Sequence, residues 1–172
     1  MNKTYDNLIE RRSIRRYKDA QITKEELELV IKAGLCAPSA KNLQSAIIVA
    51  VQDKDDIACM SKLNAEVMGV SSDPFYGAPT VLVVLADAGN RCAVQDGSLV
   101  MGNLMNAANA IGLGSCWINR AYEVFEKPEG KALLKKWGVM GDYIGVGNCI
   151  LGYPDEAPEM KPTKAGRVYY VL

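Results

Sequence analysis

The sequence predicts one domain over residues 1–172, built on a single β-sheet flanked by helices. Segments with helical periodicity alternate with short apolar runs of strand length along the whole chain. No repeat or linker divides these segments, and 172 residues, of which 49% are hydrophobic, are enough to bury one core. Such an order of elements fits one sheet with helices packed on its faces.

Two helices are expected before the first strand. The first should be short and begin behind Thr4, a candidate N-cap, because the apolar residues that follow recur at helical spacing. The second should begin at the capping box formed by Thr23 and Glu26, which precedes an apolar stripe. Pro38 should end it, because proline cannot continue a helix interior.

Five strands and three further helices are expected in the rest of the chain. The runs of strand length are residues 46–51, which we expect to be central, 80–85, 115–118, 143–153 and 167–172. Helical patterns cover residues 53–68, 91–111 and 128–136. The helix at 91–111 is apolar on several faces and rich in glycine and alanine, so it should be buried centrally or against a partner subunit.

Charge and composition exclude several classes of function. The 20 basic and 20 acidic residues cancel, so there is no electrostatic reason to expect nucleic acid or a membrane surface as a partner. No apolar run approaches the length of a membrane span, and no apolar signal region follows Met1. The five cysteines are scattered without a close pair. This pattern favours neither a zinc site nor a disulfide framework, and it fits a reducing cytoplasm.

The chain contains no histidine. This absence removes Ser-His-Asp and Cys-His nucleophilic catalysis and also the commonest metal ligand. The acidic residues are dispersed and form no convincing carboxylate dyad. If the protein is an enzyme, we therefore expect a bound cofactor to carry the reaction.

Two polar motifs indicate the kind of cofactor. Residues 11–17 place four arginines around one hydroxyl, and residues 37–44 form a polar turn with amide and hydroxyl donors. Guanidinium groups bind a phosphate in a bidentate manner, and the turn suits a flat ring rich in heteroatoms. Lys164 and Arg167 add cations beside the terminal run. Together the motifs predict convergence on one phosphorylated cofactor.

Simpler interpretations of these motifs remain open at this point. The arginines suit a solvated helix end, where cations favour the helix dipole, and Pro38 with its neighbours suits a plain helix stop. Gly-x-Gly occurs at 112–114 and 145–147, but Trp117 and Ile150 stand where a dinucleotide loop needs its third glycine. No P-loop pattern is present.

Five motifs in order resemble those of the FMN-dependent nitroreductase family. They are R-R-S-I-R-x-Y at 11–17, A-P-S-x-x-N-x-Q at 37–44, G-A-P at 77–79, G-L-G-S-C-W-I at 112–118 and K-x-x-R-V-x-Y at 164–170. The resemblance runs from Tyr5 to the C-terminus. It implies an α+β sandwich with a mixed, mostly antiparallel central sheet, and an intertwined homodimer with FMN at the subunit interface.

The resemblance also implies a role for individual residues. Arg11 and Ser13 match positions on the FMN phosphate, Arg12 belongs to the same turn, and Arg15 matches a cation near the flavin pyrimidine. The residues that match a turn reaching the flavin from the second subunit are Pro38, Ser39, Ala40, Asn42 and Gln44. The segment whose backbone faces flavin N5 corresponds to Ile118 and Asn119. The phosphate-binding tail corresponds to Lys164 and Arg167.

The implied reaction is reduction of FMN by NADH or NADPH, followed by electron transfer to a small-molecule acceptor in the same cleft. Nitroaromatics, quinones and flavins are the expected acceptors, and one open face serves both substrates in turn, so ping-pong kinetics follow. One alternative is a flavin-binding redox sensor or flavin store without significant turnover. Another is a relative that consumes flavin or dehalogenates a substrate, for whose added lid this chain has little room.

The chain departs from the family pattern at three places. Ser45 and Ala46 replace a frequent proline and tryptophan, so packing under the polar turn should differ. Asn119-Arg120 stands where glycine is common, which affects the substrate face. Thr163 replaces a frequent basic residue and removes one possible phosphate contact.

Overall fold

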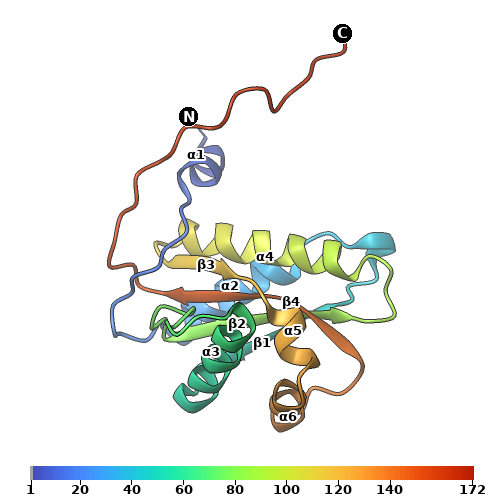
Figure 1. Ribbon diagram of the computed structural model, residues 1–172. Coiled ribbons are helices and arrows are strands. Elements are labelled where there is room, and N and C mark those ends of the chain that lie inside the picture. Colours follow the sequence, from blue (N-terminus) through green and yellow to red (C-terminus); the bar gives the residue numbers. More distant parts are fainter. Residues whose placement is uncertain (1) are drawn as a thin grey trace.

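The computed structural model describes residues 2–172 and has mixed helical and strand structure (Figure 1). Its helices are α1 (Lys3–Glu10), α2 (Lys24–Leu35), α3 (Lys54–Met68), α4 (Ala93–Ala110), α5 (Ala121–Glu126) and α6 (Pro128–Lys136), with a 3₁₀ turn, η1, at Ala40–Asn42. Its strands are β1 (Ala46–Val51), β2 (Thr80–Asp87), β3 (Gly114–Ile118) and β4 (Tyr143–Gly152).

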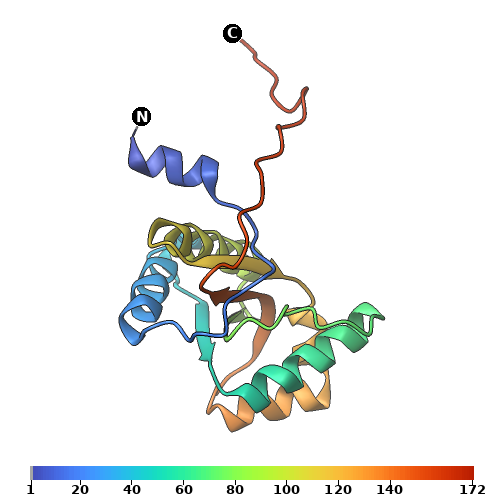
Figure 2. The same cartoon turned by 90° about the vertical axis from the view of Figure 1, so that its left-hand side faces the viewer.

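The four strands form one open sheet in the order β1-β2-β4-β3, and every neighbouring pair is antiparallel. The parallel pairing seen within residues 2–172 is an isolated bridge between Ser13 and Ser115, a residue of β3. Helices α2 and α4 cover one face of the sheet, and α3, α5 and α6 cover the other (Figures 1 and 2). The α+β sandwich expected from the resemblance is therefore confirmed.

The side chains of strand β2 contribute to two hydrophobic cores, one on each face of the sheet. Val81, Val83 and Leu85 point to the layer of α3, α5 and α6, whereas Leu82 and Val84 point to the layer of α2 and α4. All five side chains are fully buried. A continuous apolar run, without polar alternation, is what a strand covered on both faces requires.

Short-range signals located most of the elements correctly. Thr23 Oγ1 accepts from the Glu26 N–H at 3.1 Å and the Glu26 carboxylate accepts from the Thr23 N–H at 2.8 Å, so the predicted capping box is present. The helix predicted at 128–136 has those bounds, with Pro128 in its first turn. The remaining predicted helices and the first four predicted strands lie within about two residues of their predicted limits.

Three expectations about the elements were wrong or incomplete. The cap of α1 is Asn2, whose side chain accepts from the Thr4 N–H at 2.8 Å, rather than Thr4 itself. Strand β1 lies at an edge of the sheet instead of its centre. Its apolar run follows from contacts on both faces, since Ile47 packs with one core and Ile48 with the other. Helix α5 was not expected, because it has six residues and no side-chain cap.

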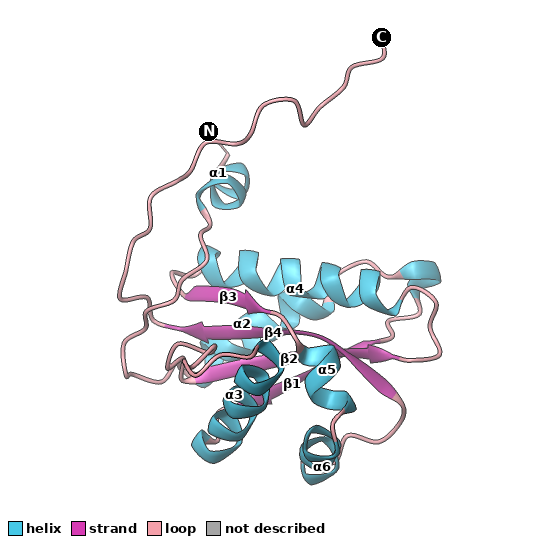
Figure 3. Ribbon diagram, in the orientation of Figure 1, coloured by secondary structure: helices cyan, strands magenta, loops and turns pink. Residues whose placement is uncertain are grey.

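The predicted strand at 167–172 is absent from the single chain. The segment is extended and exposed, with Tyr169 at 89%, and it pairs with no strand of the described residues. The chain runs as a loop away from the sheet after Tyr153 and ends beyond α1 (Figure 3). A strand needs a neighbouring strand to bond with, and no strand formed by residues 2–172 pairs with this segment. Within residues 2–172, no helix combines the length and apolar character needed to cross a bilayer.

Candidate functional site

The arginine turn begins where α1 ends. Arg11 is the C-cap of α1 and its N–H bonds the Asn7 carbonyl at 3.1 Å. The Arg12 guanidinium donates to the Ile9 carbonyl at 2.8 Å and also to the Arg11 carbonyl. These two hydrogen bonds stabilise the backbone of the turn. Arg11 Nη1 is buried, and no residue of the described chain accepts a hydrogen bond from it. Arg12 thus has a partner in the backbone, whereas Arg11 lacks one for this nitrogen.

The residues after Arg12 run alongside the edge strand β3. The Ile14 N–H bonds the Ser115 carbonyl at 3.0 Å, next to the bridge between Ser13 and Ser115. The Tyr17 hydroxyl closes the segment by donating to the Ile14 carbonyl at 2.6 Å. Burial raises the pKa of Tyr17 well above its ordinary value. Strand pairing and the tyrosine together fix Ser13 and Arg15 relative to the sheet.

The first residues of the C-terminal tail bind the same segment. The Lys18 N–H bonds the Tyr153 carbonyl at 3.0 Å, and the Arg15 N–H donates to the Glu156 carboxylate. The predicted phosphate residues of the tail lie beyond this point. Lys164 is eight residues after Glu156, and an extended chain of eight residues reaches about 26–29 Å. Lys164 and Arg167 are exposed and make no ion pair within residues 2–172.

The second polar motif forms an unusual turn around η1. Lys41, Asn42 and Gln44 have φ values of 52°, 55° and 49°, in the left-handed region that side chains other than glycine rarely adopt. The Gln44 N–H bonds Ser39 Oγ at 2.9 Å, and the Gln44 amide bonds Asn42 Oδ1 at 3.1 Å. A conformation of this kind persists only where surrounding structure fixes it.

Asp96 on α4 is the residue that fixes the turn, and the sequence reasoning missed it. Asp96 is 3% exposed, and its carboxylate accepts from the Ala40 N–H at 2.9 Å and from the Asn90 side chain at 2.9 Å. Ser45 Oγ lies 3.4 Å from it and accepts from Asn90 at 2.6 Å. The departure at Ser45 therefore contributes a hydroxyl to this network. One signal was available, because Asp96 is the one charged residue among positions 93–110.

A single chain does not bring the two motifs together. Asp96 holds the polar turn near the start of α4, whereas α1 binds its other end, where the Asn7 amide donates to the Asn106 carbonyl at 3.0 Å. Ten residues separate these contacts, which is about 15 Å along a helix. In Figure 1, α1 lies over the end of α4 opposite to its first turn. Within the described residues of one chain, the two motifs that the sequence predicted to converge on one ligand therefore bind opposite ends of α4.

Ile118 and Asn119 lie where β3 passes into α5. Ile118 ends the strand and is buried, and Asn119 is exposed. Arg120 follows with a φ of 77°, so it adopts the backbone conformation that glycine takes most readily. Its guanidinium pairs with the Glu123 carboxylate at 2.9 Å. The departure at this position preserves a glycine-like turn and directs the arginine towards α5.

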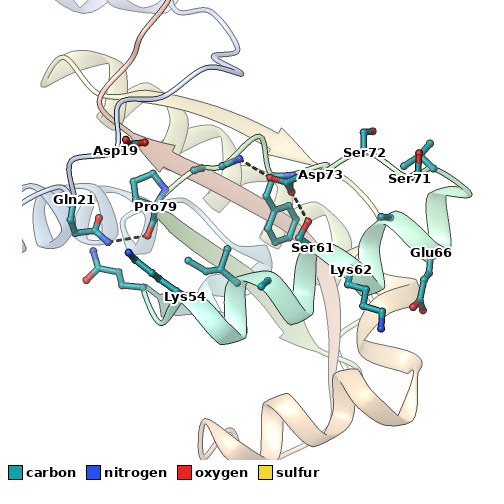
Figure 4. Close-up of a pocket in the computed structure, with 18 residues that line it drawn as sticks. Asp19, Gln21, Lys54, Ser61, Lys62, Glu66, Ser71, Ser72, Asp73 and Pro79 are labelled. Carbon is teal, nitrogen blue, oxygen red and sulfur yellow. Dashed lines mark hydrogen bonds between the residues drawn. The ribbon is translucent and has the colours of Figure 1, made fainter.

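A large cavity lies away from both motifs. It has a volume of about 1020 Å³ and lies between α3 and the 70–79 loop, as Figure 4 shows. None of the residues assigned to a cofactor lines it. A cavity of about 150 Å³ adjoins the polar turn at Pro38, Ser39 and Gln44. Three of the predicted cofactor residues thus adjoin a small cavity, whereas the cavity of about 1020 Å³ contacts none of them.

The arginine turn nevertheless fits a phosphorylated flavin. A guanidinium keeps its charge in a protein, so the buried Arg11 Nη1 requires an acceptor. Burial and the nearby Cys116 raise the pKa of Cys149 to about 12, and the positive charge of Arg11 opposes this rise. A phosphate would satisfy Arg11 beside the Ser13 hydroxyl. The roles assigned to the individual site residues remain predictions.

Comparisons with known proteins agree with this fold and identify the family. The family model described as the nitroreductase family matches residues 8–153. A protein of Archaeoglobus fulgidus, whose name proposes an NADH dehydrogenase/NAD(P)H nitroreductase, is 34% identical over 85% of this chain and 82% of its own. The NADPH-flavin oxidoreductase of Vibrio harveyi is 29% identical over 94% of this chain and 70% of its own.

The fold comparison reaches the same result. A crystal structure of a Bacteroides fragilis nitroreductase with bound FMN superposes with a TM-score of 0.89. It covers all of both chains at 26% sequence identity. The match of the family model over most of the chain, the sequence relatives and this shared fold lead to one conclusion. The chain belongs to the nitroreductase family.

Proposed function

We propose that this protein is an FMN-dependent oxidoreductase that uses NAD(P)H to reduce small-molecule acceptors, namely nitroaromatics, quinones or flavins. The buried, unpartnered Arg11 Nη1 is the observation that carries the proposal, because it calls for an anion at the start of the family's first motif. FMN in the B. fragilis relative and the flavin oxidoreductase name of the V. harveyi relative support it. Residues 1–172 would form one FMN-binding domain.

The phosphate would be held by groups from both ends of the chain. Arg11 and Ser13 supply a guanidinium and a hydroxyl at a fixed place beside β3, and the exposed Lys164 and Arg167 close over the phosphate from the tail. Charge-assisted hydrogen bonds of this kind are roughly twice as strong as neutral ones. Arg12 would act indirectly, because its guanidinium already binds the backbone of the turn.

Bound FMN supplies the redox chemistry, taking electrons from NAD(P)H and giving them to an acceptor in the same cleft, which leads to ping-pong kinetics. Arg15 would place its positive charge at the pyrimidine edge of bound FMN and would stabilise the negative charge of the reduced flavin. The backbone at Ile118 and Asn119 would lie along the ring near N5. No side chain needs to act as a nucleophile, consistent with a chain that has no histidine.

We propose that the active form is an intertwined homodimer. Helix α1 has no buried residue in the single chain, and it projects above α4 (Figure 2). Helices α1, α2 and α4 carry large apolar side chains that are each at least 45% exposed, namely Tyr5, Leu8, Ile9, Leu29, Leu35, Val94 and Leu99. The apolar end of the tail is exposed as well. A second copy would cover these surfaces and bring Pro38, Ser39, Ala40, Asn42 and Gln44 to the first chain's arginines.

Anaerobic mixing of the purified protein with NADH or NADPH tests the proposed reaction. We expect a yellow protein that carries about one non-covalent FMN per chain and bleaches on mixing, then regains its colour with a quinone. A yellow protein that never bleaches would support the flavin store instead. A colourless protein that does not bind added FMN, or one that releases FAD on heating, would refute the proposal.

A further inference from the structure

The 70–79 loop contains a turn that is fixed at several points. Asp73 Oδ1 accepts from the Phe75 N–H at 2.8 Å and from Ser61 on α3, and Asp73 Oδ2 accepts from the Gly77 N–H at 2.7 Å. The Asp73 carboxylate and its bond to Ser61 are visible in Figure 4. Phe75 is 1% exposed and anchors the turn in the core. The residue between Phe75 and Gly77 therefore has little freedom to move.

That residue is Tyr76, which adopts a conformation unusual for its type. Its φ is 54°, in the left-handed region, and the tyrosine is 44% exposed. A bulky residue in this region is strained, and such strain is concentrated at functional sites. The fixed neighbours Phe75 and Gly77 hold the ring at the surface of the molecule, where burial of apolar area gives it little stabilisation.

The ring of Tyr76 faces Arg15. The guanidinium carbon of Arg15 lies 6.0 Å from the ring centroid, at the limit of a cation–π contact. Arg12 and Arg16 bind backbone carbonyls or Asp155, whereas the Arg15 guanidinium has no hydrogen bond or ion pair within residues 2–172. Nearby Glu156 accepts from the Arg15 backbone N–H. Among the described residues, the tyrosine ring is thus the contact that orders this guanidinium.

We propose that Tyr76 is a positioning residue that holds Arg15 against the pyrimidine edge of bound FMN. This inference rests on the proposed function. A flexible arginine loses conformational entropy when it meets its ligand, and a rigid aromatic surface removes part of that loss in advance. Because the charge of Arg15 matters most when the flavin is negatively charged, Tyr76 should favour the reduced form of FMN over the oxidised form.

Four single variants, including Arg15→Ala as the reference, and one double variant test this role. Tyr76→Leu removes the aromatic ring, Tyr76→Phe keeps it, and Ser72→Ala is a control in the same loop that leaves the turn intact. Tyr76→Leu is also combined with Arg15→Ala. The first measurement is the ratio of the dissociation constants for oxidised and reduced FMN, which requires no turnover. The second is the rate of anaerobic flavin reduction at saturating NAD(P)H.

Tyr76→Leu should leave the dissociation constant of oxidised FMN within about twofold of wild type. It should weaken binding of reduced FMN by about two- to fivefold, as expected for a cation–π contact of about 0.5–1 kcal/mol, and slow reduction to a similar extent. Tyr76→Phe and Ser72→Ala should match the wild type, and Tyr76→Leu should have no further effect in the Arg15→Ala protein.

An unchanged ratio and rate in Tyr76→Leu would overturn the inference, as would an equal effect of Tyr76→Leu with and without Arg15. Loss of oxidised FMN from Tyr76→Leu would also contradict it, because the tyrosine would then serve binding itself. A wild-type protein that binds no FMN would refute the proposed function, and this outcome is separate from the others.

Discussion

Replacing Asp96 with alanine should both destabilise the protein and weaken FMN binding. The carboxylate lies on α4, yet it holds the turn that we place at the flavin of the partner subunit. The substitution removes the acceptor of the Ala40 N–H, and no other acceptor for this N–H is present within the described residues. Asn90 keeps its bond to Ser45 at 2.6 Å, so the loss concentrates on the turn.

The magnitude follows from these contacts. Loss of a hydrogen bond to a charged group costs about 1.5–3 kcal/mol. Alanine also removes the desolvation penalty of the buried carboxylate, which offsets part of this cost. We expect the free energy of unfolding to fall by about 2 kcal/mol, and the Tm to fall by about 4–8 °C for a chain of this size. Each turn residue that FMN must then reorder costs about 1–2 kcal/mol. Reordering one or two residues would weaken FMN binding by at least about fivefold and by up to about several hundredfold.

Urea unfolding and FMN titration of Asp96→Ala measure the two effects. Asp142→Ala is the matched control, because Asp142 is exposed and its side chain makes no hydrogen bond or ion pair in the described chain. Asp96→Asn should show a smaller loss, since its carbonyl oxygen still accepts from Ala40. If Asp96→Ala bound FMN as tightly as the Asp142→Ala control, Asp96 would not shape the flavin site.

Three further predictions concern the cofactor, the dimer and acid stability. Arg15→Ala should keep FMN but slow its reduction by NAD(P)H about ten- to hundredfold, or about 1.5–3 kcal/mol. Arg11→Ala should instead chiefly weaken FMN binding. Stopped-flow reduction and FMN titration separate the two effects, and identical defects in both variants would refute the assignment. Gly102 on α4 has nothing within 4 Å of an added Cβ in the single chain, so Gly102→Leu should sediment as a monomer if this face packs on a partner, and an intact dimer would contradict that packing. The pKa of Asp56 lies below its ordinary 3.8 chiefly because Lys136 donates a hydrogen bond to it. The stabilisation by ionised Asp56 is therefore present above pH 3.8 and is lost as the pH falls through the lower pKa of the folded state. The difference in unfolding free energy between wild type and Asp56→Asn should shrink below about pH 4. A difference that does not depend on pH would refute this prediction.

The parts of the fold that depend on neighbouring residues in the sequence were predictable. The capping box at Thr23 and the proline at the start of α6 act within one turn of helix, so the sequence alone located these helices. The position of a strand within a sheet depends on distant partners instead. For this reason the apolar run at Ala46–Val51 was correctly identified as a strand but wrongly placed at the centre. The run at 167–172 has strand-like composition but lacks a partner within one chain.

In the candidate site, too, features set by residue type and order were predictable, whereas features set by distant contacts were not. Motif resemblance identified the family and the arginine turn, since these rest on residue type and order. It did not reveal that Arg12 binds its own backbone or that Arg16 pairs with Asp155. Nor did it reveal the Asp96 network, in which the Asp96 side chain bonds to the backbone of Ala40, a residue distant in the sequence. The separation of the two motifs along α4 also follows only from the three-dimensional arrangement.

A mixed dimer tests most directly whether each FMN site is built from two chains. Co-expression with two different affinity tags would yield a dimer in which one chain carries Arg11→Ala and the other carries Asn42→Ala. If the arginines of one chain meet the turn of its partner, one site of this dimer contains both substitutions and the other contains none. FMN titration should then find one site of wild-type affinity per dimer, whereas both parent homodimers bind weakly. Two equally weakened sites in the mixed dimer would contradict the account, because each chain would then build its own site.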